Sequence, residues 1–194
     1  MPEPDPTLPR SIELASRHDS RLLIIDVQEK LLPHIQRGPR IVTNCHKLIE
    51  GAQAVGVPAF ATEQYPKGLA PTVAELRDLL GDVPQKLRFS GADVLGWTTA
   101  GESDDDRDRI IVAGIEAHVC VLQTACDLMA RGFRVQIVAD AVGSRRRIDR
   151  RIALERLATA GATVTTTEAV LFEWCEAAGT EEFQRIRQIV LERD

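Results

Sequence analysis

Short apolar runs alternate along the chain with segments of helical period, and this alternation is the feature that most restricts the fold. The predicted strands span residues 21–26, 57–62, 83–86, 109–113, 134–139 and 163–167. Most are apolar at successive positions, which is typical of parallel strands buried on both faces. The two clearest helical stripes are Ile41, Cys45, Leu48, Ile49, Ala52 and Val55, and then Val121, Ala125, Leu128 and Met129. This order predicts an α/β fold with a mainly parallel six-stranded sheet covered by helices on both faces.

Glycines support the same division of the chain. Gly56, Gly132 and Gly161 each follow a helical segment, where a residue able to adopt positive φ ends a helix at little cost. No linker rich in Pro, Gly and Ser divides the rest of the 194 residues. We therefore expect an N-terminal arm over residues 1–20, lying on the body or on a neighbouring subunit. A single domain is expected over residues 21–194.

Composition excludes several classes of function. The net charge is -5, the chain has no long basic stripe, and its single Tyr leaves few platforms for stacking bases, so no nucleic-acid partner is expected. No apolar run approaches the roughly 20 residues that span a bilayer, and the first residues lack the apolar core of a signal peptide. We expect a cytoplasmic protein with no membrane partner. The cysteines form no CxxC pair, and no GxGxxG follows the first predicted strand, so neither a metal nor a nicotinamide cofactor is expected.

Chemically active side chains follow the predicted strands at one edge of the sheet. Ligands of open α/β sheets bind beyond the carboxyl ends of the strands. Asp26 ends the first predicted strand, Thr62 to Gln64 end the second, Lys86 ends the third, and residues 114–120 end the fourth. An acid, a base and a thiol are therefore predicted to meet at this edge.

Each of these three residues has two interpretations. A cysteine in the first turn of a helix, as expected for Cys120, gains from the helix dipole and from free N–H groups, which favour the thiolate and also suit an oxyanion. A buried cysteine among apolar residues is equally a small core side chain. Asp26 is either the general base for this thiol or a helix cap or a partner of a structural arginine. Lys86 is either the cation that keeps Asp26 ionised or a surface lysine.

The ordered motifs LLIIDVQ at 22–28, KxxFS at 86–90, GIxxxxCVxxTA at 114–125 and VADAV at 138–142 resemble those of the isochorismatase-like cysteine hydrolases. The resemblance covers residues 20 to 190. The segments TEQYPKGLAPTVAEL at 62–76 and GIEAHVC at 114–120 are similar to the subgroup of isochorismatase domain-containing proteins.

This resemblance implies a three-layer α/β/α fold and a catalytic triad of Asp26, Lys86 and Cys120. It also implies a cis peptide between Ile115 and Glu116, with the backbone N–H groups of Glu116 and Cys120 forming an oxyanion hole. The side chain of Glu116 is not expected to take part. The implied reaction is hydrolysis of a small amide or related C–N bond through a thioester on Cys120, without a cofactor. The implied assembly is a homo-oligomer, a dimer or larger.

The chain also departs from its relatives. Nicotinamidases of this superfamily have an acid and several histidines after the second strand to hold a metal, whereas no histidine occurs in residues 62–66. No metal is expected, and nicotinamide is a less favoured substrate. The candidate substrate-binding residues are Gln64, Tyr65, Phe89 and His118.

Two alternatives to catalysis remain open. The chain is either a non-catalytic interaction protein on the same fold or a thiol-based redox sensor in which Cys120 is oxidised without turnover. The basic run from Arg145 to Arg151 is interpreted as a solvated start of a helix, with binding of an anion or of an acidic neighbouring subunit as the alternative.

Overall fold

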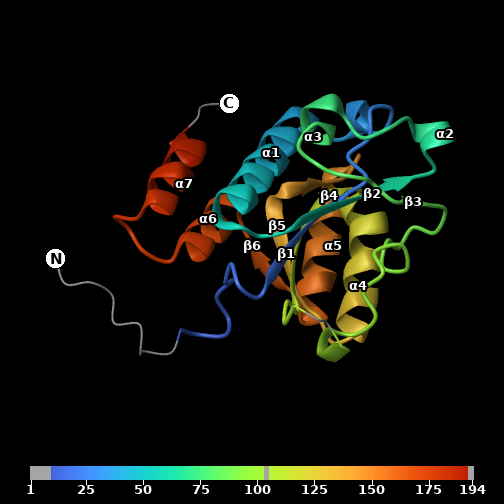
Figure 1. Cartoon of the computed structure of the whole chain (residues 1–194). Helices are drawn as coiled ribbons and strands as arrows, with labels where there is room; N and C mark the ends of the chain where they lie inside the picture. The colour runs from blue at the N-terminus through green and yellow to red at the C-terminus, as the bar shows by residue number, and fades with distance from the viewer. Residues whose placement is uncertain (1–9, 103–104, 192–194) are drawn as a thin grey trace.

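A parallel sheet forms the centre of the molecule (Figure 1). The computed structural model describes residues 10–102 and 105–191, so residues 1–9 of the predicted arm, residues 103–104 and residues 192–194 lie outside it. The strands are β1 (Ser20–Ile25), β2 (Ala59–Gln64), β3 (Gln85–Lys86), β4 (Arg109–Ile115), β5 (Arg134–Gly143) and β6 (Thr163–Thr165). Their order in the sheet is β3-β2-β1-β4-β5-β6, and every neighbouring pair is parallel. The predicted α/β class is confirmed.

The helices cover both faces of this sheet. They are α1 (Gly38–Val55), α2 (Pro66–Leu69), α3 (Ala74–Arg77), α4 (Leu122–Ala130), α5 (Arg147–Thr159), α6 (Thr167–Cys175) and α7 (Glu181–Leu191). In β1, Leu22 and Ile24 pack with α1, α6 and α7, whereas Leu23 and Ile25 pack with α4 and α5. Both faces of the strand are therefore buried, which explains its unbroken apolar sequence. Three layers, α/β/α, result.

The strand boundaries differ from the predicted ones for local reasons. The predicted strand at 83–86 shortens to Gln85–Lys86, because Pro84 lacks the N–H that a strand ladder requires. The second strand begins only at Ala59, after Pro58, and continues to Gln64. The fifth strand extends to Gly143, beyond the predicted end at 139. The predicted helix ends are confirmed, because Gly56, Gly132 and Gly161 have φ values of 75°, 86° and 105°.

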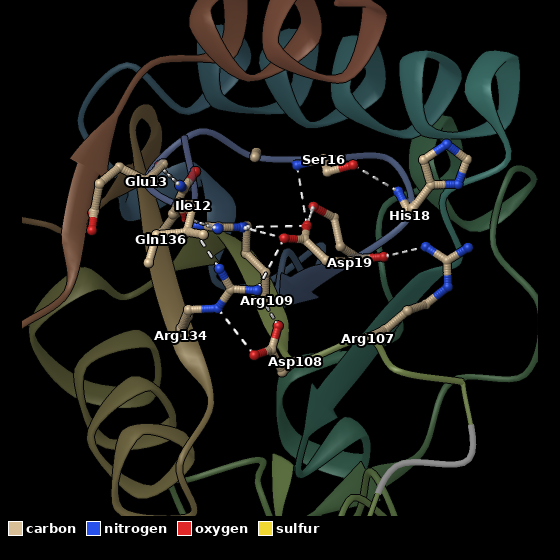
Figure 2. A network of polar contacts seen from close by, with 12 residues as sticks. Ile12, Glu13, Ser16, His18, Asp19, Arg107, Asp108, Arg109, Arg134 and Gln136 are labelled. Carbon is tan, nitrogen blue, oxygen red and sulfur yellow. Dashed lines mark hydrogen bonds and ion pairs between the residues drawn. The ribbon is translucent and has the colours of Figure 1, made fainter. Parts of the chain in front are cut away.

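Residues 10–19, the described part of the predicted arm, lie at the amino ends of the strands (Figure 2). Arg134 donates to the carbonyl of Ile12 at 3.0 Å, and Arg109 donates to the same oxygen. The carboxylate of Asp19 lies between these two guanidinium groups, 3.3 Å from Arg109 and 3.0 Å from Arg134. Arg107 donates to the carbonyl of Arg17 at 2.7 Å. This network occupies the edge of the sheet opposite to the carboxyl ends.

Candidate active site

Asp26 follows β1 and is fully buried at the carboxyl edge of the sheet. Its φ of 53° turns the chain away from the strand direction. Lys86 Nζ donates to Asp26 Oδ2 at 2.7 Å, and Thr62 Oγ1 donates to Asp26 Oδ1 at 2.8 Å. Both carboxylate oxygens accept hydrogen bonds, and these bonds favour the ionised form of the side chain against the effect of its burial.

Lys86 ends the two-residue strand β3, and its side chain is only 2% exposed. Besides Asp26, its ammonium group donates to Gln64 Oε1 at 2.7 Å and to the carbonyl oxygen of Phe89 at 3.0 Å. A longer hydrogen bond, 3.4 Å, runs from the same ammonium group to the carbonyl oxygen of Arg88. The alternative of a surface lysine is therefore wrong, and the cation is fixed beside the carboxylate.

Cys120 lies in a short π-helical turn, Ala117–Val121, between β4 and α4. The peptide bond between Ile115 and Glu116 is cis, at the position that the resemblance implied. The N–H groups of Val119 and Val121 donate to the carbonyl of Glu116 at 3.0 and 3.2 Å. Cys120 is 5% exposed, and Asp26 and Lys86 are the charged groups that act on its thiol. The fold thus brings the acid, the base and the thiol together.

Two glycines allow this close approach. A Cβ on Gly114, which has a φ of 120°, would lie 2.1 Å from the carbonyl oxygen of Ile25. No side chain fits between β4 and β1 at the level where Asp26 and the cysteine loop leave the sheet. A Cβ on Gly91 would lie 3.1 Å from Thr62 Cγ2 and 3.6 Å from Lys86 Cε, so this glycine permits the dense packing around the lysine.

Burial dominates the protonation of the thiol. Loss of hydration, followed by repulsion from Asp26, raises the pKa of Cys120 to about 12, although the Lys86 ammonium opposes this shift. Burial also raises the pKa of Asp26, against the attraction of Lys86. The expectation that the helix position favours a resting thiolate is therefore wrong, because burial and the neighbouring carboxylate raise the pKa of the thiol. At neutral pH the resting Cys120 is a thiol.

The four candidate substrate-binding residues lie in different environments. Gln64 is buried, and its side chain bonds Lys86 and the carbonyl oxygen of Leu87, the latter at 2.9 Å. Tyr65 and Phe89 have exposed side chains next to this buried cluster in the sequence. His118 turns toward the loop after β5, where its Nδ1 lies 3.0 Å from the hydroxyl of Ser144.

The side chain of Glu116 also has a structural partner. Its Oε2 accepts hydrogen bonds from the backbone N–H of Arg145 at 3.0 Å and from Nε of the same residue at 3.1 Å. This carboxylate thereby joins the loop before Cys120 to the loop after β5. That this side chain takes no part in the chemistry stays a prediction.

Sequence reasoning missed Gln28 as a supporting residue. Its side chain is fully buried, with Oε1 accepting from the N–H of Gln64 at 2.8 Å. Its Nε2 donates to the carbonyl oxygens of Gln64 at 3.0 Å and of Ala70 at 2.6 Å. This amide clamps the end of β2 and thereby positions the glutamine that binds Lys86. Gln28 ends the LLIIDVQ motif, which was the available signal.

Among the described residues, no group of three or more His, Cys, Asp and Glu side chains is arranged to hold a metal ion. In the same part of the chain, no helix has the length and apolar character required to cross a membrane.

Known proteins share both the sequence and the fold. A model of the isochorismatase domain matches residues 20–169. Isochorismatase domain-containing protein 2 of Danio rerio is 38% identical over 175 residues, which are 90% of this chain and 88% of that protein. The solved structure of MAR1 ribonuclease from Caenorhabditis elegans is 35% identical, with a TM-score of 0.84 over 92% of this chain and 93% of that one. YcaC of Escherichia coli, described as an octameric hydrolase of unknown specificity, shares the fold at 24% identity, with a TM-score of 0.77 over 93% of this chain and 91% of its own.

Proposed function

This chain belongs to the isochorismatase domain family, and from that premise we propose that it hydrolyses a small amide or related C–N bond through a thioester on Cys120. The observation that carries the proposal is the buried Asp26–Lys86 ion pair, 2.7 Å between Nζ and Oδ2, in contact with the thiol of Cys120. Burying charged groups is costly unless they are paired, so an ion pair placed against a thiol is best explained by chemistry at that thiol.

In the proposed reaction, Asp26 takes the proton of Cys120 as the sulfur attacks the carbonyl carbon of the substrate. Lys86 compensates the negative charge, which passes from the carboxylate to the sulfur. The backbone N–H groups of Glu116 and Cys120 are the proposed donors to the oxyanion. The C–N bond breaks, and the amine leaves with the proton from Asp26. Asp26 then deprotonates a water molecule that attacks the thioester, which releases a carboxylic acid and restores the thiol.

General-base activation agrees with the raised pKa of Cys120. A thiol whose pKa is about 12 needs a base that acts during the attack, and the neighbouring Asp26 is the proposed base. Because the thiol is only 5% exposed, the substrate must pass residues at the surface. We place Tyr65 and Phe89, which are 49% and 52% exposed, at this entrance.

An assay of a panel of small amides tests the proposal, with released ammonia or amine as the readout. We expect Cys120→Ser to lower kcat by about 10³-fold or more, because a serine at this site is a much weaker nucleophile. Cys126→Ser is the matched control, since Cys126 is an exposed cysteine on α4. Full activity of Cys120→Ser, with unchanged circular dichroism, would overturn the proposal.

The name of the C. elegans relative raises cleavage of RNA as a second candidate. The same variants are therefore assayed on a single-stranded RNA. Cleavage of RNA that depends on Cys120, without amide turnover, would replace our proposal. Reversible oxidation of Cys120 without turnover of either substrate would instead favour the redox sensor, and an inert thiol would favour the interaction protein.

We also propose a homo-oligomer, dimer or larger, in the cytoplasm. The octameric description of E. coli YcaC supports an oligomer, as do exposed apolar side chains such as Phe172 and Leu191, which are 39% and 62% exposed. Light scattering coupled to gel filtration measures the mass, and fractionation of cells measures the location. A monomeric mass would contradict the first proposal.

A further inference from the structure

A recess lies between the start of α1 and the end of β5. Its volume is about 390 Å³, which falls within the range of small-molecule sites. The polar lining residues that matter below are Arg37, Arg40, Asp140, Ser144, Arg147 and Arg150. The hydrogen bond between Ser144 and His118, 3.0 Å long, connects the recess to the cysteine loop.

The absence of a side chain at Gly143 lets the segments that carry these arginines pack together. A Cβ on Gly143 would lie 2.2 Å from Ile41 Cδ1 and 2.7 Å from Ile35 Cγ2, so the first turn of α1 packs directly on the end of β5. The N–H of Gln36 donates to the carbonyl of Ser144 at 3.2 Å, which joins the segments that precede α1 and α5. The N-termini of these two helices, 18 and 13 residues long, therefore adjoin the same recess.

The recess has an excess of positive charge. Four guanidinium groups against the single carboxylate of Asp140 leave three positive charges. Asp140 Oδ1 accepts from the N–H and the hydroxyl of Thr167 at 2.8 and 3.0 Å, so it is held toward α6. Within residues 10–102 and 105–191, no ion pair is formed by any of the four arginines.

The innermost cation is Arg150. Its Nε donates to the carbonyl of Val142 at 2.9 Å, and its Nη2 donates to the carbonyl of Ala139. Burial and repulsion from Arg37 lower the pKa of Arg150, and Asp140 offsets only part of this effect. A bound anion would relieve the repulsion between the guanidinium groups. The exposed Arg37, Arg40 and Arg147 surround this fixed cation.

We propose that this recess binds a small molecule that carries a phosphate monoester. Guanidinium groups bind phosphate oxygens bidentately, and the N-termini of α1 and α5 add a favourable dipole. A phosphate dianion neutralises more of the excess charge than one carboxylate would. The site is connected to the cysteine loop through His118 and shares no residue with the Asp26–Lys86–Cys120 cluster. The proposal therefore goes beyond the proposed hydrolysis and does not depend on it.

Isothermal titration with inorganic phosphate and with glycerol phosphate, at constant ionic strength, tests the proposal on the full chain. We expect one saturable site per chain, with Kd raised about tenfold or more by Arg37→Gln and by Arg147→Gln. The control is Arg151→Gln, on the same helix but outside the recess, with an expected change below about twofold. Both altered arginines are exposed, and thermal melts verify that each variant is folded.

Three results would overturn the proposal. One is the absence of saturable binding of either phosphate probe at millimolar concentration. Another is an equal loss of binding in Arg151→Gln, which would indicate general charge attraction. The third is occupancy of the recess by a macromolecule while neither phosphate probe binds. A change of oligomeric mass in the Arg37 and Arg147 variants would indicate another copy of the chain, and binding of a single-stranded RNA that depends on these arginines would indicate RNA.

Discussion

At the scale of single residues, the candidate site contains one cation, Lys86, and two groups that can carry a negative charge beside it, the carboxylate of Asp26 and the thiol of Cys120. Lys86 is hydrogen-bonded to Asp26 and interacts with Cys120. The carboxylate is fixed by two donors, whereas the thiol keeps its proton because burial raises its pKa to about 12. At rest the proton is therefore on the sulfur, and Asp26 is the neighbouring group that can accept it.

This balance predicts that Asp26→Asn makes Cys120 more reactive toward alkylation, not less. The substitution removes the repulsion that raises the pKa of Cys120 and leaves Lys86, which lowers it. Iodoacetamide labelling between pH 7 and 10, read by mass spectrometry, measures the rate, with the exposed Cys126 as the reference in the same sample. We expect a faster rate and a lower apparent pKa at Cys120 in a variant that remains folded by circular dichroism. An unchanged or slower rate would contradict this assignment of charges.

At the scale of secondary-structure elements, the site depends on how closely β4 lies against β1. Ile25 is level with Gly114, so Asp26 and the loop that carries Cys120 leave the sheet as neighbours. The pairing of β4 with β5 shifts register between Val112 and Gly114, which marks the same level as irregular. The glycine is required by its φ of 120° as well as by the lack of space.

Replacing Gly114 by Ala is therefore expected to lower the free energy of unfolding by about 3 kcal/mol or more, since backbone atoms would have to move. The matched control is Gly81→Ala, where an added Cβ meets nothing within 4 Å. We expect the control to change stability by less than about 0.5 kcal/mol. Urea unfolding measures both values, and equal values would show that the approach of β4 to β1 is not restrictive.

At the scale of the whole molecule, residues that one topological rule places together could be predicted from the sequence. Asp26, Lys86 and Cys120 each lie at or just beyond the carboxyl end of a parallel strand, so their convergence needed only the strand order. The protonation of Cys120 could not be predicted, because it depends on burial in the finished fold. That Arg37 and Arg147 line the same recess could not be predicted from the sequence either, since it depends on the contact of Gly143 with α1.

At the opposite edge of the sheet, Asp19 forms ion pairs with Arg109 of β4 and Arg134 of β5 and so joins the segment before β1 to both strands. Asp19→Ala would leave the guanidinium of Arg109, only 3% exposed, without this carboxylate. We expect a loss of about 2 kcal/mol in the free energy of unfolding and faster proteolysis within residues 10–19. The control is Glu155→Ala, which breaks an exposed pair with Arg151 on α5 and should cost less than about 0.5 kcal/mol. Equal costs would contradict this role for Asp19.

The central claim is that Cys120 becomes acylated during turnover. The most direct measurement is an acid quench of the wild-type enzyme with an amide that it turns over, followed by mass spectrometry of the peptide that contains Cys120. The account predicts a mass gain equal to the acyl group of the substrate, on Cys120 alone, which hydroxylamine removes. Continued turnover with no acyl group on Cys120, or with the acyl group on another side chain, would contradict it.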